Sequence, residues 1–377
     1  MRTPIDPATP LRSRSLRFLL VATVGGFSGY ALLLPVVPLW AVAGGAGETA
    51  AGATNAVFML VTVLTQLAMP WALTRIDVRG LFAAGTVLIG APTPLYALSS
   101  ELWMLLAVSA LRGVGFGLLT VTGSALVAEL VPVAQRGRAA GLYGLAIGLP
   151  NVVLLPAGVW LSEHIGFAPL FWGAGVLPVV AAASVLGIAQ VHVGAPEHGE
   201  RPTGMVALLP WWVVMVVVTA SAGGLTAFVS MAIDPTLASL ALLAFGGAGM
   251  IGRWAAGRLG DRFGQRGVLA PSIIIGAVGF ALLAVAAWLS GPVALVGAAL
   301  FGLGFGAVQN TTLVLMLERV DSGSASTAWN IAFDGGQGLG AIGFGALISG
   351  LGFSPTFALA AALILASRFV MGLRVRL

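Results

Sequence analysis

Long apolar runs alternate with short polar connections along the whole chain. A helix needs about 20 residues to cross a hydrocarbon core of about 30 Å, because each residue advances it by about 1.5 Å. Twelve apolar runs of about this size can be counted. They cover approximately residues 17–40, 50–73, 80–99, 102–130, 138–161, 168–190, 206–230, 236–258, 267–290, 293–317, 325–349 and 355–373. The pattern predicts an all-α integral membrane protein with twelve transmembrane helices, the first of them bent near Pro35 and Pro38.

The charged residues between these runs indicate how the chain is oriented. All 18 Lys and Arg positions are Arg, and those outside the runs lie in the N-terminal tail, in the loops that follow even-numbered runs, or at the C-terminus. The opposite loops carry acidic residues, namely Glu48, Glu101, Glu163 and Asp234. Because arginine accumulates in cytoplasmic loops, we expect both termini to be cytoplasmic.

An internal repeat divides the chain in two. LRGVGFG at 111–117 is echoed by LFGLGFG at 300–306, which begins 189 residues later. The longest polar connection after the N-terminal tail lies between the two copies. We therefore predict an N-terminal six-helix bundle over residues 1–191, a cytoplasmic linker over 192–205 and a C-terminal six-helix bundle over 206–377.

The composition excludes several classes of protein. Only 8% of the residues are charged and the mean hydropathy is +1.02, whereas soluble proteins contain about 25% charged residues. The net charge of +5 does not indicate nucleic-acid binding, because the arginines lie between apolar runs. The chain has no Cys, no paired histidines at metal-ligand spacing and no phosphate-binding loop of the Walker type. We expect no cofactor, no metal and no enzymatic activity.

One polar stretch, GRLGDRFGQR at 257–266, lies between the eighth and ninth runs. We expect a tight loop there, turned by Gly260 and Gly264, with the Asp261 carboxylate offered to a helix N-terminus. The stretch resembles the loop signature G-x-L-x-D-R-x-G-x-R of the major facilitator superfamily. Every fixed position of that signature matches: Gly257, Leu259, Asp261, Arg262, Gly264 and Arg266. The corresponding stretch of the first half, at 72–80, is degenerate, because Arg75 replaces the Asp.

The resemblance implies two six-helix halves that rock about a central cavity, with 257–266 as a conformational-switch loop. Asn and Gln are costly in lipid unless they face protein or water, so they are candidates for the cavity wall. With Tyr30 of the first run, the candidates are Asn55, Gln66, Asn151, Gln309, Asn310, Asn330 and Gln337. Such residues are also suited to hydrogen bonding between helices, and both interpretations stay open.

Two charged residues lie deep inside predicted helices, Asp334 in the eleventh run and Arg112 in the fourth. A charge at the bilayer centre costs about 2.5–3.5 kcal/mol on insertion scales, so each needs water, a partner or neutralisation. Our hypothesis is that Asp334 carries a proton and that Arg112 modulates it or contacts an anionic group. Arg112 partly matches the fourth-helix signature R-x-x-x-G-x-G, in which the resemblance associates the Arg with proton coupling. A static buried ion pair or a packing role is the alternative.

These features predict a multi-pass secondary transporter of the plasma (inner) membrane. The mostly apolar helices with one deep acid favour proton-coupled efflux of amphipathic small molecules, such as drugs or natural products, by alternating access. The alternative is a proton-linked symporter or facilitator that takes up a small polar metabolite such as a sugar. A transporter-like receptor or a membrane-embedded enzyme is more remote. The expected partners are a small-molecule substrate, protons and the lipid bilayer, and the protein is expected to be a monomer.

Overall fold

The computed structural model describes residues 13–131, 136–190, 205–289, 291–320 and 322–370. Within these residues all regular structure is helical. The α-helices are α1 (Arg14–Leu33), α2 (Val36–Ala43), α3 (Glu48–Leu73), α4 (Val78–Gly90), α5 (Leu102–Leu130), α6 (Arg136–His164), α7 (Phe167–Ala182), α8 (Leu209–Ala232), α9 (Pro235–Phe263), α10 (Gln265–Leu289), α11 (Gly291–Leu317), α12 (Ser322–Leu351) and α13 (Phe353–Val370). Three 3-10 helices also occur, η2 (Thr93–Ala97), η4 (Ala183–Gly187) and η5 (Met205–Leu208).

The described helices contain twelve segments long and apolar enough to cross a membrane. This confirms the predicted number of spans. The first span combines α1 and α2 over Arg14–Ala43, and Pro35 stands where the two helices meet. Since proline lacks an N–H and its ring crowds the preceding turn, the predicted bend is confirmed as a break in the helix.

The chain forms two compact units. The first contains 13–33, 61–154 and the rest of α6 and α7 from Leu161. The second contains Leu34–Leu60, Leu155–Trp160 and the C-terminal part of the chain. The units therefore divide α3 and α6 internally. The predicted division into bundles at 1–191 and 206–377 stays a prediction, because nearly all of the linker at 192–205 lies outside the described residues.

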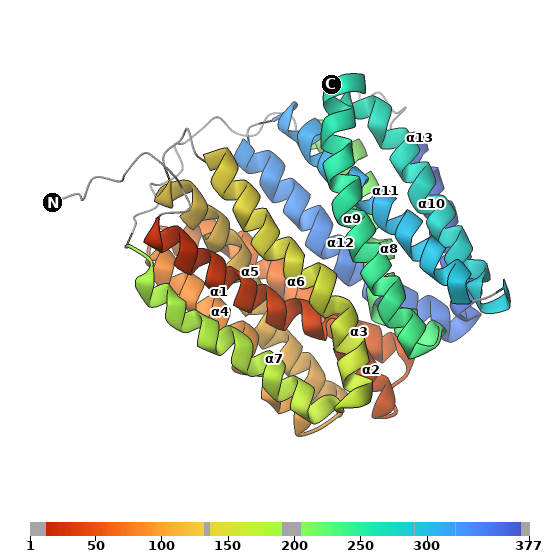
Figure 1. Ribbon diagram of the computed structural model, residues 1–377, viewed down its shortest axis with the longest axis horizontal. Coiled ribbons are helices and arrows are strands. Elements are labelled where there is room, and N and C mark those ends of the chain that lie inside the picture. Colours follow the sequence, from red (N-terminus) through yellow and green to blue (C-terminus); the bar gives the residue numbers. More distant parts are fainter. Residues whose placement is uncertain (1–12, 132–135, 191–204, 290, 321, 371–377) are drawn as a thin grey trace. The chain divides into compact units, whose positions relative to one another are not determined.

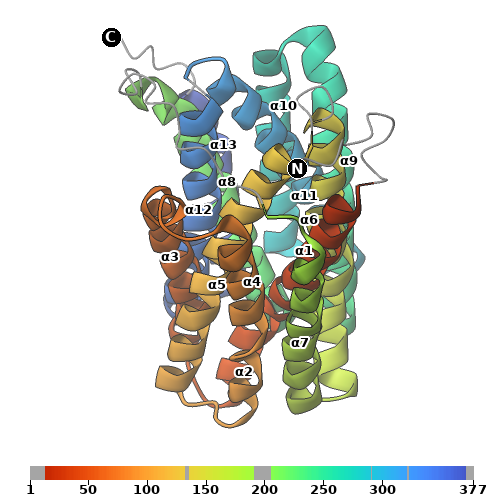
Figure 2. The same cartoon turned by 90° about the vertical axis from the view of Figure 1, so that its left-hand side faces the viewer.

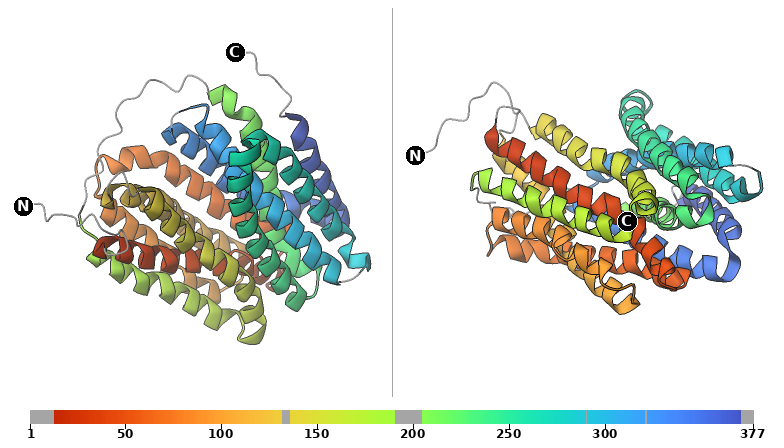
Figure 3. Two further views of the ribbon diagram at one scale, coloured as in Figure 1. Left: turned by 45° about the horizontal axis from the view of Figure 1, so that its top comes forward. Right: turned by 60° about the horizontal axis from the view of Figure 1, so that its bottom comes forward.

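In the first unit, α4 packs along α5 and α1 packs along α7. Figure 2 shows α4 beside α5, and both views of Figure 3 show α1 in red beside α7 in yellow-green. In the second unit, α11 packs against α9 and α10, and α12 packs against α8 (Figure 1). Of the most apolar segment of each span, 83% is buried in the first span and 78% in α8. These two spans are therefore the most enclosed by protein.

Glycines in the two repeated motifs make equivalent helix contacts. A Cβ added at Gly115 of α5 would crowd the backbone of α4, and one at Gly304 of α11 would crowd the backbone of α10. In the same way Gly117 approaches α3 and Gly306 approaches α9. Only glycine permits backbones to come this close. The repeat in the sequence therefore corresponds to a repeated packing arrangement.

Candidate functional site

Asp334 lies within α12, twelve residues after its start and seventeen before its end. These separations correspond to about 18 Å and 26 Å along the helix axis. The side chain is buried, with 5% of its surface exposed. The carboxyl group therefore lies well inside a predicted membrane span and is enclosed by protein.

Close packing of α8 on α12 explains this burial. The Thr219 hydroxyl of α8 donates a hydrogen bond to the Ala332 carbonyl, at 3.0 Å. A Cβ at Gly336 would overlap the Thr219 side chain, and one at Gly340 would overlap the Ala220 carbonyl. The two glycines, in the turns of α12 that follow this hydrogen bond, thus bring α8 directly against α12 beside the acid.

Polar side chains of α8, α11 and α12 are linked one turn from Asp334. The Trp329 indole N–H donates to the Gln309 carbonyl at 3.2 Å and to the Thr312 hydroxyl at 3.3 Å. The Thr312 hydroxyl lies 3.5 Å from Sδ of Met215 on α8. Oε1 of Gln309 is buried and accepts no hydrogen bond from the described residues. A buried acceptor that forms no hydrogen bond costs about 1–3 kcal/mol of stability. A hydrogen-bond donor on a ligand would remove this cost, so the oxygen is a candidate contact for a ligand.

Aromatic rings continue from this point across three helices. Trp329 stacks on Phe333 at 5.3 Å between ring centroids and an interplanar angle of 22°. Phe333 lies 6.3 Å from Phe305 of α11, and Phe305 lies 5.3 Å from Phe245 of α9. We call these four residues the aromatic ladder. Phe333 directly precedes Asp334, so the ladder and the acid share one turn of α12.

The remaining candidates of the second half differ in burial. Asn330 is exposed, whereas Gln337 is 7% exposed and Gln309 is 3% exposed. Asn310 is half-buried on α11. Three polar residues of α12 at helical spacing, Asn330, Asp334 and Gln337, therefore pass from an exposed turn to buried ones.

Arg112 of α5 lies in the first unit and is 3% exposed. Its Nε donates to the Ile89 carbonyl of α4 at 3.2 Å, and its Nη2 donates to the Gly29 carbonyl of α1 at 2.8 Å. Its guanidinium carbon stands 5.6 Å from the ring centroid of Tyr96, whose hydroxyl lies 2.8 Å from that of Ser109. The guanidinium therefore joins three helices through backbone acceptors. Asp334 belongs to the other unit, and a pair between the two charges stays a prediction.

Tyr30 and Gln66, also in the first unit, contact neighbouring helices. Tyr30 is 5% exposed and stacks on Phe116 of α5 at 4.2 Å, with Phe27 in edge contact. The Gln66 amide donates to the Thr120 hydroxyl at 3.2 Å. Sequence reasoning did not select Phe27 or Phe116, because phenylalanines in an apolar run carry no signal that distinguishes them from ordinary packing.

Asn55 and Asn151 bond to backbone carbonyls. The Asn55 amide donates to the Leu34 carbonyl at 2.8 Å, beside the break between α1 and α2. The Asn151 amide donates to the Ile147 carbonyl one turn earlier in its own helix, at 2.8 Å. For Asn55 and Gln66 the structure shows hydrogen bonding between segments, while their place in a cavity wall stays a prediction.

The loop signature is mostly helical. α9 continues to Phe263, the chain turns at Gly264 with φ of +78°, and α10 begins at Gln265. The expectation that Gly260 also forms the turn is wrong, because Gly260 lies in the last helical turn. Its lack of a Cβ makes room for the Gln265 side chain, which folds against it. The side chain of Asp261 lies outside the described part of the chain.

The corresponding junction of the first half keeps an acid at a shifted position. α3 ends at Leu73 and α4 begins at Val78, with Asp77 as the N-cap. The Asp77 carboxylate accepts a hydrogen bond from the Gly80 N–H at 3.0 Å. The comparison of the two halves placed Arg75 opposite Asp261, so the cap at Asp77 was not predicted. Among the described residues no group of three His, Cys, Asp or Glu could hold a metal ion.

Twelve apolar spans, the repeated glycine contacts and a buried intramembrane acid define a polytopic transporter of the plasma membrane. The chain belongs to the Major Facilitator Superfamily, whose model matches residues 19–341. It is therefore a membrane transporter of that family and not an enzyme.

Similar proteins support this placement. An uncharacterized MFS-type transporter of Mycobacterium tuberculosis, Rv1877, is 30% identical over 207 residues, which cover 54% of this chain and 28% of the relative. The inner membrane transport protein YdhP of Escherichia coli K12 is 29% identical over 264 residues, 64% of each chain. The chain thus spans less than two thirds of the length of these relatives. The solved structure of a mutant of the peptide transporter POT superposes with a TM-score of 0.79 at 14% identity, covering 95% of this chain and 93% of that one.

Proposed function

We propose that this protein exports amphipathic small molecules in exchange for protons and that Asp334 is the proton carrier. The burial of this carboxyl group deep within α12 carries the proposal. In alternating access the site opens to one side of the membrane and then to the other, so a carboxyl group within it can exchange protons with each side in turn.

The groups around Asp334 favour a substrate that contains a planar ring and a hydrogen-bond donor. The aromatic ladder offers ring faces, and Oε1 of Gln309 offers an acceptor without a described donor. A distant relative, the purine ribonucleoside efflux pump NepI of Shigella sonnei, is 25% identical over 219 residues and is named for a ring-bearing substrate. Asn310 and Asn330, which are less buried, are the residues we assign to the polar side of such a substrate.

Uptake of a small polar metabolite is the second candidate. It draws support from the Myo-inositol transporter 2 of Cryptococcus neoformans, which is 32% identical over 136 residues, 35% of this chain. In that case the buried amides of Gln309 and Gln337 would bind hydroxyl groups, and net movement would be inward.

In the proposed cycle one set of helix contacts closes while another opens. A contact suited to this role joins the first turns of α3 to the last turns of α12, through Thr49 and Ser349. We assign the α9–α10 junction, with Gly257 to Arg266, to the switch at the end that carries the arginines. The transporter acts as a monomer in this proposal.

Dye accumulation tests the direction and the proton coupling together. Cells that lack their own efflux pumps express the wild type, Asp334→Asn or the control Gly343→Ala, and are loaded with ethidium, with a panel of planar amphipathic dyes or with a labelled polyol. We expect the wild type and Gly343→Ala to lower dye accumulation and a protonophore to abolish the difference. Equal accumulation in wild-type and Asp334→Asn cells for every compound would overturn the proposal, and higher accumulation of a polyol with wild type would favour uptake.

A further inference from the structure

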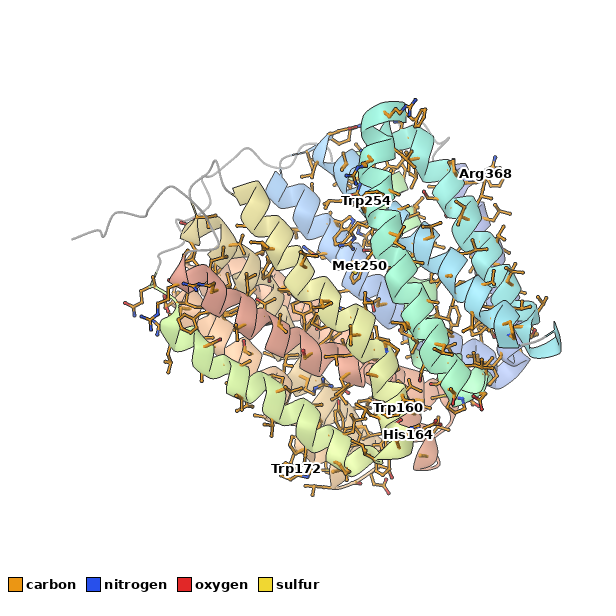
Figure 4. All side chains as sticks on the ribbon, in the orientation of Figure 1. Trp160, His164, Trp172, Met250, Trp254 and Arg368 are labelled. Carbon is orange, nitrogen blue, oxygen red and sulfur yellow. The ribbon has the colours of Figure 1, made fainter. Side chains whose placement is uncertain are left out.

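The arginine-rich end of α9 combines exposed rings with exposed cations. Trp254 is 61% exposed, Phe263 is 62% exposed, and Leu259 between them is 44% exposed. Arg258 and Arg262 are also exposed. Figure 4 labels Trp254 one turn beyond Met250 on the α9 ribbon. Large apolar side chains beside arginines on one helix end are typical of a surface at the membrane interface.

An aromatic ring lies near each of the three arginines Arg258, Arg262 and Arg266. The guanidinium carbon of Arg258 stands 3.8 Å from the ring centroid of Trp254, one turn earlier. Arg262 stands 5.2 Å from the ring of Phe263, and Arg266 stands 5.8 Å from the ring of Trp211. A ring that lies beneath a guanidinium restricts the orientation of the guanidinium but leaves the guanidinium N–H donors unused. Those donors can then pair in a bidentate way with phosphate oxygens.

The order of these residues along the axis corresponds to the layers of a lipid leaflet. The apolar span of α9 ends at Gly260. Trp254 lies about 9 Å before that end and Arg258 about 3 Å before it, whereas Arg262 lies beyond it. The Trp254 ring and the Arg258 guanidinium, 3.8 Å apart, therefore lie together near the end of the apolar span, and Arg262 lies beyond it, toward the depth of lipid phosphates.

We propose that Trp254, Arg258, Arg262 and Arg266 form a binding site for the headgroup of an anionic phospholipid. Three arginines outnumber the one acid of this segment, Asp261, so the site favours a headgroup with net negative charge. A phosphatidylcholine headgroup carries a positive charge of its own, so we expect the site to bind it less tightly. The exposed Trp254 and Leu259 accept the acyl chains.

A second pair of the same kind stands near the end of α3. Arg75 lies 4.6 Å from the ring centroid of Trp71, again one turn apart, and Trp71 is 61% exposed. The exposed tryptophans Trp103 and Trp172 have no Arg within eight residues in the sequence. Exposed tryptophan without arginine therefore also occurs in this protein, and it supplies a matched control.

Lipid retention by the purified full-length protein tests the proposal. The protein is stripped of lipid in a neutral detergent, mixed with phosphatidylglycerol or phosphatidylcholine of the same acyl chains, and bound lipids are counted by native mass spectrometry. We expect wild type to retain phosphatidylglycerol preferentially. Arg258→Gln should weaken that retention about fivefold, as expected for loss of one interfacial arginine. Trp254→Ala should also weaken it and tests the site if Arg258→Gln fails to fold.

Two control variants separate a built site from general charge or surface effects. Arg319→Gln removes one exposed arginine beside Glu318 at the end of α11, and Trp172→Ala removes one exposed tryptophan of α7. Both are expected to retain phosphatidylglycerol as the wild type does. Equal loss in Arg258→Gln and Arg319→Gln, or equal retention of both lipids by wild type, would overturn the proposal.

Discussion

The hydroxyl oxygens of Thr49 and Ser349 lie 3.1 Å apart and join the first turn of α3 to the last turn of α12. The Ser349 hydroxyl also lies 3.3 Å from a carboxylate oxygen of Glu48. A Cβ at Gly52 would overlap the Ala341 carbonyl, and one at Gly345 would overlap the Glu48 carbonyl. Glycines thus bring the two backbones together, and three polar side chains hold their ends.

We predict that Thr49→Cys with Ser349→Cys cross-links readily and stops transport reversibly. The chain contains no Cys, so the introduced pair reacts without background. Sulfur atoms at these positions need only a small movement to reach the bonding distance of about 2.05 Å. The cross-link is read as a mobility shift, and a reductant should restore transport. Thr49→Cys with Gly343→Cys is the control, and transport unaffected by a complete cross-link would show that this contact need not open.

Gly340→Ala should destabilise the protein, whereas Gly343→Ala should not. A Cβ at Gly340 would overlap the Ala220 carbonyl of α8, but one at Gly343 meets no atom within 4 Å. Overpacking of this kind costs about 1–3 kcal/mol. The midpoint of thermal unfolding in detergent, followed by size-exclusion chromatography, measures both variants on the same helix. Identical midpoints would argue against the close approach of α8 and α12 around Asp334.

We predict that lysine at position 112 does not maintain the stability that arginine provides there. The guanidinium donates to two carbonyls on different helices, and one ammonium on a flexible stem does not reproduce that fork. A hydrogen bond to a charged group contributes about 1.5–3 kcal/mol, and Arg112 makes two of them. We expect Arg112→Lys and Arg112→Gln to lower the unfolding midpoint. If both variants kept wild-type stability while only their proton-driven transport changed, a coupling role would be favoured over the structural one.

Asn55→Ala should cost more stability than Asn151→Ala. Asn55 bonds the Leu34 carbonyl beside the helix break, whereas Asn151 bonds the Ile147 carbonyl of its own helix. Hydrogen bonds between segments in membrane proteins contribute about 0.6 kcal/mol on average and up to about 1.7 kcal/mol. Unfolding midpoints of the two variants, compared at equal expression, provide the measurement. A larger loss for Asn151→Ala would contradict this assignment.

The spans were predictable because the bilayer imposes a length and a hydrophobicity on each helix. The bend near Pro35 was predictable from local chemistry, since proline removes a backbone donor wherever it stands. The turn at Gly260 was predicted wrongly. A glycine needed for close packing cannot be distinguished by sequence from one needed for a positive φ, and the Gln265 side chain that covers Gly260 belongs to the next helix.

The arrangement around Asp334 was less predictable. Its depth could be estimated by counting residues, but Thr219, Trp329 and the ladder ring Phe305 come from turns whose mutual contacts depend on tertiary packing. The Asn and Gln positions were predictable as residues that need partners in lipid. Their partners, such as the Leu34 carbonyl for Asn55, were not, because backbone acceptors carry no side-chain signal.

The most direct test of the account is proton-driven uptake of ethidium by the purified protein in liposomes with an acidic interior. Ethidium has a fixed positive charge, so a pH gradient alone does not concentrate it as a weak base. We expect wild type to accumulate the dye until an ionophore collapses the gradient, and Asp334→Asn to bind the dye without accumulating it. Gradient-driven accumulation by Asp334→Asn at the wild-type rate would contradict the assignment of Asp334 as the proton carrier.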